Sequence, residues 1–164
     1  MGVGKTTVSR LLMKKLPNSV FLDGDWCWES SPFVVTNETK AMVMDNICHL
    51  LNNFIHCSVY ENIIFCWVMH QQEIIDAILK RLDTEGCIVH AISLTAKAEA
   101  LAARLQRDID AGVRTPDIIE RSISRIPLYD MLNTIKINTT SLTADEAADC
   151  IMALHQGGNY GVHS

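Results

Sequence analysis

The chain has 164 residues, of which 48% are apolar and 20% are charged, a composition typical of one compact globular domain. Its net charge of −5 argues against a general nucleic-acid-binding protein, because such proteins need a basic surface to displace counterions from phosphates. No apolar run reaches membrane-spanning length, and the first residues do not have the pattern of a secretory leader. The six cysteines are scattered without a C-x-x-C pair, so we expect reduced thiols and a cytoplasmic location.

Strand-like and helix-like segments alternate along the chain. A helical period of apolar residues marks residues 38–55, whereas residues 62–69 form the continuous apolar run of a strand that is buried on both faces. Helices are predicted over residues 4–16 (entered from a loop), 38–55, 73–82 and 96–111, with further helices starting after Thr115 and Thr143. Strands are predicted over residues 19–22, 62–69, 87–94 and 134–138. This rhythm predicts an α/β fold, with a mostly parallel sheet and helices on both faces.

Three threonines, Thr95, Thr115 and Thr143, are expected to cap the helices that follow them. Pro116 comes directly after the second of these threonines, as is typical of a first helical turn. Glu146 lies three residues after Thr143, which predicts a reciprocal capping box at the start of the last helix.

The first seven residues contain the phosphate-binding end of a Walker A motif, Gly2-Val3-Gly4-Lys5-Thr6-Thr7. In such a motif glycines let the backbone close around phosphate oxygens, Lys5 reaches the β- and γ-phosphates, and the Thr6 hydroxyl ligates Mg²⁺. The helix that follows directs its positive end at the anion. A chance match at a glycine-rich amino terminus is the alternative, and the helical pattern from Val8 onward argues against it.

The complete pattern has an earlier glycine and, before it, a buried strand, both of which would precede Met1. Loss of about five buried apolar residues, at roughly 1.5–3 kcal/mol each, rivals the total stability of a domain. We therefore expect the first strand to be truncated here and the native start to lie upstream.

An acidic turn, Asp23-Gly24-Asp25, follows the strand over residues 19–22. Ligands of parallel α/β sheets bind beyond the carboxyl ends of the strands, so this turn is expected to face the γ-phosphate. A carboxylate there takes the proton of an attacking hydroxyl or orients Mg²⁺ through water, and Asp25, the later residue, is preferred as the base. An ordinary Asp-Gly turn is the alternative.

Aromatic residues follow the acidic turn, namely Trp26, Trp28 and Phe33. They are expected either to form an apolar wall for the acceptor or to pack against the covering helices, and the sequence favours neither.

Five arginines follow the fourth predicted strand: Arg104, Arg107, Arg114, Arg121 and Arg125. Arginine at a phosphoryl-transfer site stabilises the charge of the transferring group. The last two are one turn apart and are expected on one helix face. Weak surface pairs are the alternative, with Arg104 bonded to Asp108 and Arg107 to Asp110. The short loop around Gly112 is expected to act as a lid.

The motifs, taken in order, resemble the shikimate-kinase-like branch of the P-loop nucleoside and small-molecule kinases. The matching pieces are the Walker A residues, the acidic turn, Leu101-Ala102-Ala103-Arg104-Leu105 and Arg125-Ile126-Pro127-Leu128-Tyr129. The resemblance implies that Arg104 lies against adenine and that the lid residue Arg114 reaches the phosphates. It also implies that Arg125 contacts the substrate and that the loop Thr139-Thr140-Ser141 borders adenine.

Two departures argue against shikimate itself. The triple glycine of shikimate kinases is replaced by Trp67-Val68-Met69-His70-Gln71, and residues 39–55 lack the arginine that those enzymes carry. The same architecture resembles antibiotic-modifying phosphotransferases, tunicamycin-resistance-like proteins and nucleotide kinases, so the acceptor stays open.

The sequence therefore predicts an ATP- and Mg²⁺-dependent phosphotransferase for a small-molecule acceptor, with no nucleic-acid or membrane partner. Catalysis is assigned to Lys5, Asp23, Asp25 and Arg114, nucleotide binding to the Walker A residues with Arg104, Thr139 and Thr140, metal binding to Thr6 and Asp23, and acceptor binding to Asp25, Trp26, Arg121 and Arg125. We expect one domain over residues 1–155, a lid around residues 107–118 and a flexible tail over 156–164. The alternatives are an ATP-hydrolysing regulatory protein without an acceptor, a shikimate or nucleotide kinase proper, and an inactive remnant.

Overall fold

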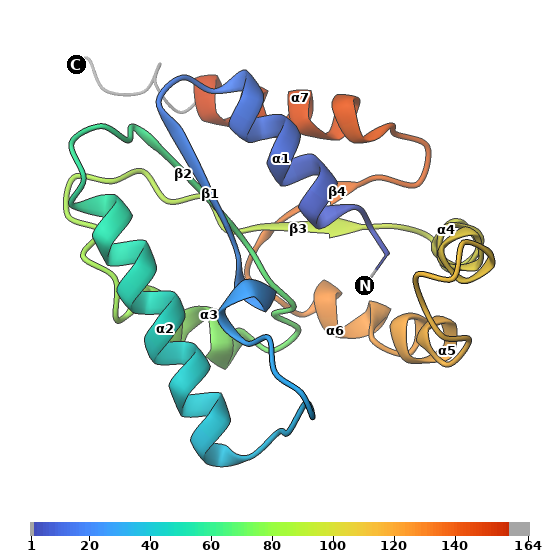
Figure 1. Ribbon diagram of the computed structural model, residues 1–164. Coiled ribbons are helices and arrows are strands. Elements are labelled where there is room, and N and C mark those ends of the chain that lie inside the picture. Colours follow the sequence, from blue (N-terminus) through green and yellow to red (C-terminus); the bar gives the residue numbers. More distant parts are fainter. Residues whose placement is uncertain (1, 158–164) are drawn as a thin grey trace. The chain divides into compact units, whose positions relative to one another are not determined.

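The computed structural model describes residues 2–157 and divides the chain into two compact units (Figure 1). The terminal unit combines Met1–Leu11 with His90–Ser164, and the central unit is Leu12–Val89. From residue 158 onward, the predicted tail lies outside the described residues. Among residues 2–157, no helix is both long and apolar enough to cross a membrane. The single domain expected over residues 1–155 stays a prediction.

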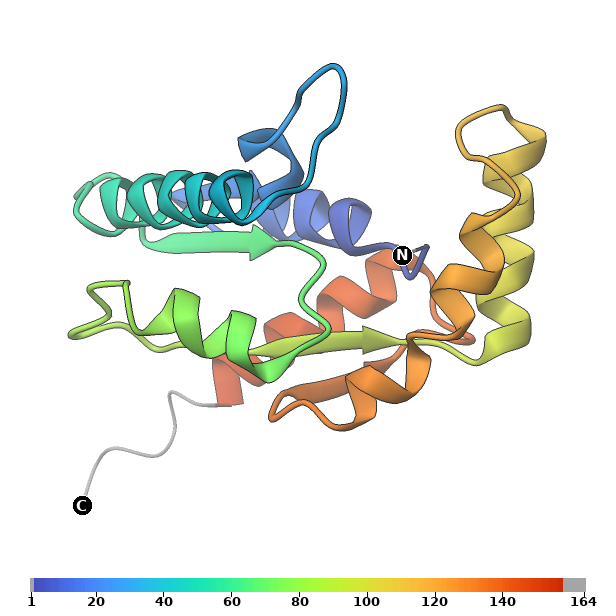
Figure 2. The ribbon, with the colours of Figure 1, turned by 90° about the horizontal axis from the view of Figure 1, so that it is seen from below.

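The central unit is built on two parallel strands, β1 (Ser19–Asp23) and β2 (Asn62–Cys66). Their register pairs Ser19 with Asn62 and Asp23 with Cys66, so both strands end at the same edge. The connection between them contains the short 3₁₀ helix η1 (Gly24–Cys27) and the long helix α2 (Asn37–Ile55), and α3 (Gln72–Leu79) follows β2 (Figure 2).

The core of the central unit forms where α2 and α3 meet β1. Val43, Ile47 and Leu51 recur every four residues on α2, which places them on one face of that helix. This face packs with Leu22 of β1 and Ile78 of α3 in one buried cluster. The apolar period predicted for residues 38–55 is therefore the core face of α2.

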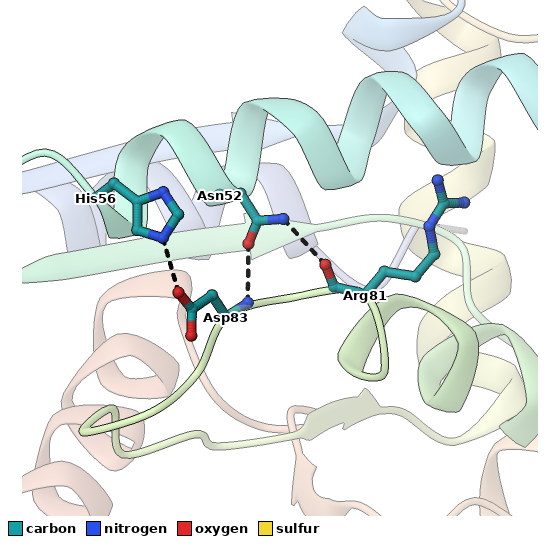
Figure 3. Close-up of polar contacts among 4 residues, drawn as sticks. All are labelled: Asn52, His56, Arg81 and Asp83. Carbon is teal, nitrogen blue, oxygen red and sulfur yellow. Dashed lines mark hydrogen bonds and ion pairs between the residues drawn. The ribbon is translucent and has the colours of Figure 1, made fainter.

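Polar contacts also join α2 to the segment after α3 (Figure 3). The Asn52 amide Nδ2 donates to the carbonyl oxygen of Arg81 over 3.0 Å, and its Oδ1 accepts from the backbone N–H of Asp83 at 2.9 Å. His56, the residue that caps the end of α2, places its Nε2 atom 2.9 Å from the carboxylate of Asp83. One side chain of α2 thus satisfies two backbone groups where α3 ends.

The terminal unit has its own parallel pair, β3 (Ile92–Thr95) and β4 (Ile135–Asn138). Helix α1 (Lys5–Lys15) begins in this unit (Figure 1). Along the chain, three helices connect β3 to β4, namely α4 (Ala98–Asp110), α5 (Ile118–Ile123) and α6 (Ile126–Asp130). Helix α7 (Ala144–Gly157) follows β4. Leu101 and Leu105 of α4 pack with Ile118 of α5, and Val3 lies against this cluster.

The predicted elements are confirmed in type and order, but several are shorter. β2 ends at Cys66 and α3 at Leu79. The strand predicted over residues 87–94 is present only from Ile92, and Ile88 and Val89 before it are exposed. A strand exists only where a partner strand supplies hydrogen bonds, and β4 offers four residues to β3.

Of the three predicted threonine caps, one is confirmed and two are wrong. The capping box of Thr143 and Glu146 is confirmed. Thr95 and Thr115 cap nothing: the first is the last residue of β3, and α5 starts three residues after the second. The single helix expected to carry Arg121 and Arg125 is also wrong, because α5 ends at Ile123 and α6 begins anew at Ile126. The proline in the first turn of α6 has no N–H with which to continue the preceding helix.

Candidate functional site

The loop before α1 has the backbone that the Walker A pattern predicts. Gly2 and Gly4 adopt φ angles of 78° and 91°, a region that favours glycine, and the Val8 N–H donates to the Gly4 carbonyl over 2.9 Å at the first turn of α1. A Cβ atom on Gly2 would lie 2.6 Å from Cδ2 of Leu105, whereas one on Gly4 would meet nothing within 4 Å. Gly2 therefore allows close packing on α4, and Gly4 borders open space.

A cavity of about 150 Å³ opens beside this loop within the terminal unit. It is lined by Gly2, Val3, Gly4, Thr7, Val8, Arg104, Thr139, Leu142, Thr143, Ala144 and Ala147. Four of the predicted Walker A residues thus share one cavity with two further residues predicted to bind nucleotide, Arg104 and Thr139. Lys5 and Thr6, which complete the motif, are half-buried in the first turn of α1.

Arg104 is fixed in the wall of this cavity by the end of β4. Its guanidinium donates to the Thr139 hydroxyl at 3.1 Å, to the Thr139 carbonyl, and to the Thr140 carbonyl at 3.5 Å. The buried Thr139 hydroxyl donates in turn to the Thr95 carbonyl over 3.1 Å, and the Thr140 hydroxyl accepts from the Lys97 N–H at 2.9 Å. The alternative pairing of Arg104 with Asp108 is therefore wrong.

The sequence predictions missed the wall that α7 contributes. Leu142, Thr143, Ala144 and Ala147 line the cavity at the start of this helix. The Glu146 carboxylate accepts from the Thr143 backbone N–H at 2.8 Å and from its hydroxyl at 2.9 Å, and these two bonds hold the pKa of Glu146 below its usual value. The capping box was the available signal, since it marks a helix that starts just beyond a strand end.

The other predicted arginines of the terminal unit differ in their contacts. Arg114 and Arg121 bind neighbouring carboxylates, Arg125 lies beside a tyrosine, and Arg107 donates to the Ala103 carbonyl. Arg114 Nε contacts Asp108 at 3.2 Å, and Arg121 contacts Asp117 at 3.5 Å. Burial raises the pKa of Tyr129, and the positive charge of Arg125 partly opposes that rise.

The residues around the cavity fit the phosphate and base of a nucleotide. A glycine with open space beside it precedes the first turn of α1, where the N–H groups and positive end of an 11-residue helix suit an anion. Val3, Val8 and Leu142 supply apolar surface, and the anchored guanidinium of Arg104 supplies a flat face.

The acidic turn lies in the central unit, at the edge where β1 and β2 end. Asp23 is 7% exposed, and its Oδ1 accepts from the Asp25 N–H at 3.1 Å. Asp25 is exposed, and its Oδ1 accepts from the indole N–H of Trp67 at 3.1 Å. A Cβ on Gly24 would lie 2.5 Å from Cγ of Trp67, so only glycine leaves room for this ring. The turn is therefore ordered by its own hydrogen bonds, and Trp67, which lies outside the turn, orients Asp25.

Trp67 is a further residue that the sequence predictions did not assign to the site. No local sequence pattern points to it, because its position beside Gly24 depends on the parallel register that pairs Asp23 with Cys66. Trp26, predicted to contact the acceptor, is 53% exposed and packs edge-on against Phe21 with ring centroids 5.2 Å apart.

Comparison with solved structures shows the same fold in several proteins. The tunicamycin resistance protein of Deinococcus radiodurans is 19% identical, with a TM-score of 0.72 over 94% of this chain and 90% of that one. A gluconokinase from Sinorhizobium meliloti 1021 is 16% identical, with a TM-score of 0.65 over 99% and 93%. A sugar kinase from Janibacter sp. HTCC2649 is 14% identical, with a TM-score of 0.67 over 94% and 89%.

A search of curated proteins finds no match to the sequence. The family comparison does find one, to the AAA domain over residues 1–124. That match includes the glycine loop, the acidic turn and Arg104. With its α/β architecture, its parallel strands and its glycine loop entering a helix, this chain belongs to the AAA domain family of P-loop proteins.

Proposed function

We propose that this protein is an ATP-dependent phosphotransferase that acts on a small-molecule acceptor. The observation that carries the proposal is the glycine loop at the start of α1, which lines one cavity together with Arg104 and Thr139. The kinase-like fold of the structural neighbours supports it.

At the phosphate end, we assign Lys5 to neutralising the β- and γ-phosphates, and the Thr6 hydroxyl would hold Mg²⁺. When bound, Mg²⁺ offsets the charge of the phosphate oxygens. The cavity wall that contains Arg104 and Thr139 receives the adenine, and Thr140 supports this wall through its carbonyl, which accepts from Arg104. The fixed guanidinium supports this assignment, because a side chain that is already ordered loses little entropy on binding.

In the acidic turn, we assign Asp25 as the base that takes the acceptor hydroxyl proton. Its exposure supports this role, as does the bond from Trp67, which orients the carboxylate without covering it. The more buried Asp23 is assigned to orienting a metal-bound water, and it also braces the backbone N–H of Asp25.

We assign Arg114 to the lid over residues 107–118. Its pair with Asp108 is partly exposed, and pairs of this kind contribute only about 0–1 kcal/mol. Arg114 can therefore exchange the Asp108 carboxylate for a more highly charged phosphate at a small cost in free energy. Arg121 and Arg125, which the sequence predicts at the acceptor, are left out of this proposal, because the helix face that they were expected to share is absent: α5 ends at Ile123 and α6 begins at Ile126.

The direct test is ADP release measured with Mg²⁺ and ATP over a panel of alcohols, nucleosides, nucleotides, shikimate and aminoglycosides. We expect Asp25→Asn to lower kcat by about 10²–10⁴-fold while ATP binding persists, because the base is removed and the cavity is not. The matched control is Glu85→Gln, which neutralises an exposed acid after α3. Equal loss of ATP binding and turnover in Asp25→Asn would contradict the assignment. ADP release that no acceptor accelerates would favour a regulatory ATPase.

A further inference from the structure

Two aromatic rings form a shelf beyond the acidic turn. We define the aromatic shelf as Trp28 and Phe33, whose ring centroids are 4.8 Å apart with planes inclined at 41°. Trp28 is half-buried against the core of the central unit, while Phe33 is 61% exposed. Val34 and Val35 follow it and are also exposed. The shelf therefore offers apolar surface on a ring that the core holds in place.

This shelf is continuous with Asp25. The backbone N–H of Trp28 donates to the Asp25 carbonyl over 3.2 Å and closes the η1 turn. Asn46 of α2 ties the same turn down by donating to the Cys27 carbonyl at 3.3 Å. The carboxylate assigned as base and the aromatic shelf thus belong to one short, braced segment.

The charge of this segment is entirely negative. Residues 23–39 contain four acids, Asp23, Asp25, Glu29 and Glu38, and no lysine, arginine or histidine. Both glutamates are exposed. Carboxylates and aromatic faces attract a cation and repel an anion, so the segment discriminates by charge.

We propose that the acceptor is a neutral or cationic alcohol with an aromatic or apolar face, which stacks on the aromatic shelf while its hydroxyl meets Asp25. The inference rests on the proposed kinase function and names the acceptor class of the same site. It separates this chain from kinases of sugar acids and of nucleoside monophosphates, whose acceptors carry the anionic charge that this segment disfavours.

The test compares acceptors that share a phenylpropane skeleton and differ in charge: phenylalaninol (cationic), 3-phenylpropane-1,2-diol (neutral) and 3-phenyllactate (anionic). Acceptor-dependent ADP release and calorimetric binding are measured on the full chain, with gluconate as an anion without a ring. We expect the cationic and neutral alcohols to exceed 3-phenyllactate in kcat/KM by about tenfold or more. Preference for 3-phenyllactate or gluconate would overturn the inference and leave the kinase proposal standing.

Two variants separate the ring from the charge. Phe33→Ala should weaken binding of phenylalaninol by about fivefold or more, whereas Val59→Ala, which shortens an exposed apolar side chain elsewhere in the unit, should not. Glu29→Lys should move the ratio of phenylalaninol to 3-phenyllactate toward the anion by about threefold or more, and Glu85→Lys should leave it unchanged. An unchanged ratio in Glu29→Lys would overturn the electrostatic argument. Calorimetric binding of phenylalaninol without any acceptor-dependent ADP release would contradict the kinase proposal and uphold the recognition of aromatic cations.

Discussion

Gly2 and Gly4 both have positive φ angles, but their surroundings differ, and so should the effects of replacing them. In Gly2→Ala the new methyl group meets Leu105 at 2.6 Å, so backbone strain and overpacking together should cost about 2–4 kcal/mol. In Gly4→Ala only the backbone strain applies, about 1–2 kcal/mol, but the methyl group enters the space assigned to phosphate.

Urea unfolding and ATP titration of the two variants distinguish these effects. We expect Gly2→Ala to lose more stability, and Gly4→Ala to lose ATP affinity by at least tenfold with a smaller loss of stability. A Gly4→Ala protein that binds ATP normally would contradict the assignment of the loop to phosphate.

Arg104 is the residue that joins α4 to the end of β4, through the Thr139 and Thr140 carbonyls. Arg104→Ala should lower the free energy of unfolding by about 2 kcal/mol, because the charged hydrogen bonds to Thr139 and Thr140 are lost. It should also weaken ATP binding. The matched control is Arg107→Ala on the same helix, since the Arg107 side chain donates to the Ala103 carbonyl within α4. Chemical denaturation of both variants measures the difference, and equal stabilities would contradict it.

At this scale the sequence predicted the roles that depend on local pattern. The glycines, Lys5 and Thr6 follow from one short motif. Trp67 could not be found this way, because its partner lies across the fold: the Asp25 carboxylate is 42 residues from the indole that holds it. A side chain's hydrogen-bond partner depends on strand register, which a motif does not encode.

Among the elements, α2 is joined to the segment after α3 by the amide of Asn52, in addition to their apolar packing. Asn52→Ala leaves the Arg81 carbonyl and the Asp83 N–H without their partner, which should cost about 2 kcal/mol (Figure 3). Asn53→Ala, the next residue on α2, removes only an exposed contact with His49 and should change stability by less than about 0.5 kcal/mol. Thermal and urea unfolding measure both, and similar losses in the two variants would contradict the role given to Asn52.

Helix α7 should show a pH-dependent stability that comes from its capping box. The pKa of Glu146 is lowered in the folded state, so its stabilising contribution is present above the ordinary pKa of 4.5 and is lost as the pH falls through the lowered value. Glu146→Gln should remove this part of the pH dependence below about pH 4.5. Thr143→Ala should cost about 1 kcal/mol at neutral pH.

The control for this cap is Glu99→Gln in the first turn of α4, a helix without a side-chain cap. Unfolding followed from pH 3 to pH 7 tests the expectation, with pH chosen to bracket the ordinary carboxyl range. An acid limb in Glu146→Gln as steep as in the unaltered chain would contradict it.

Helix ends that are set by nearby residues can be predicted from the sequence, whereas strand ends cannot. The capping box was correct because both of its partners lie within four residues. Ile88 and Val89 have strand-like side chains, but the pairing of β3 begins only at Ile92, opposite Ile135. The length of a strand is set by its partner, which lies about 40 residues away in this sequence.

At the scale of the whole molecule, the two units carry different groups of candidate residues. The terminal unit has the glycine loop and the cavity, and the central unit has the acidic turn and the aromatic shelf. The terminal unit is assembled from both ends of the chain, so its cavity needs residues more than 130 positions apart, Gly2 and Thr139 among them. Order of motifs along the sequence therefore predicted the fold class, while the composition of each unit came only from the structure.

ATP binding should stabilise the whole molecule by mass action. At 100 times the dissociation constant, a ligand specific for the folded state contributes about 2.7 kcal/mol, which for a chain of this size raises Tm by about 5–10 °C. Asp25→Asn should keep this shift in full, because Asp25 is assigned to the acceptor and not to ATP. Gly4→Ala should lose most of it, because its methyl group enters the cavity assigned to phosphate. Thermal unfolding with and without Mg²⁺ and ATP measures all three proteins. If Asp25→Asn lost the shift as fully as Gly4→Ala, the assignment of ATP binding to the glycine loop and of the acceptor to Asp25 would be wrong.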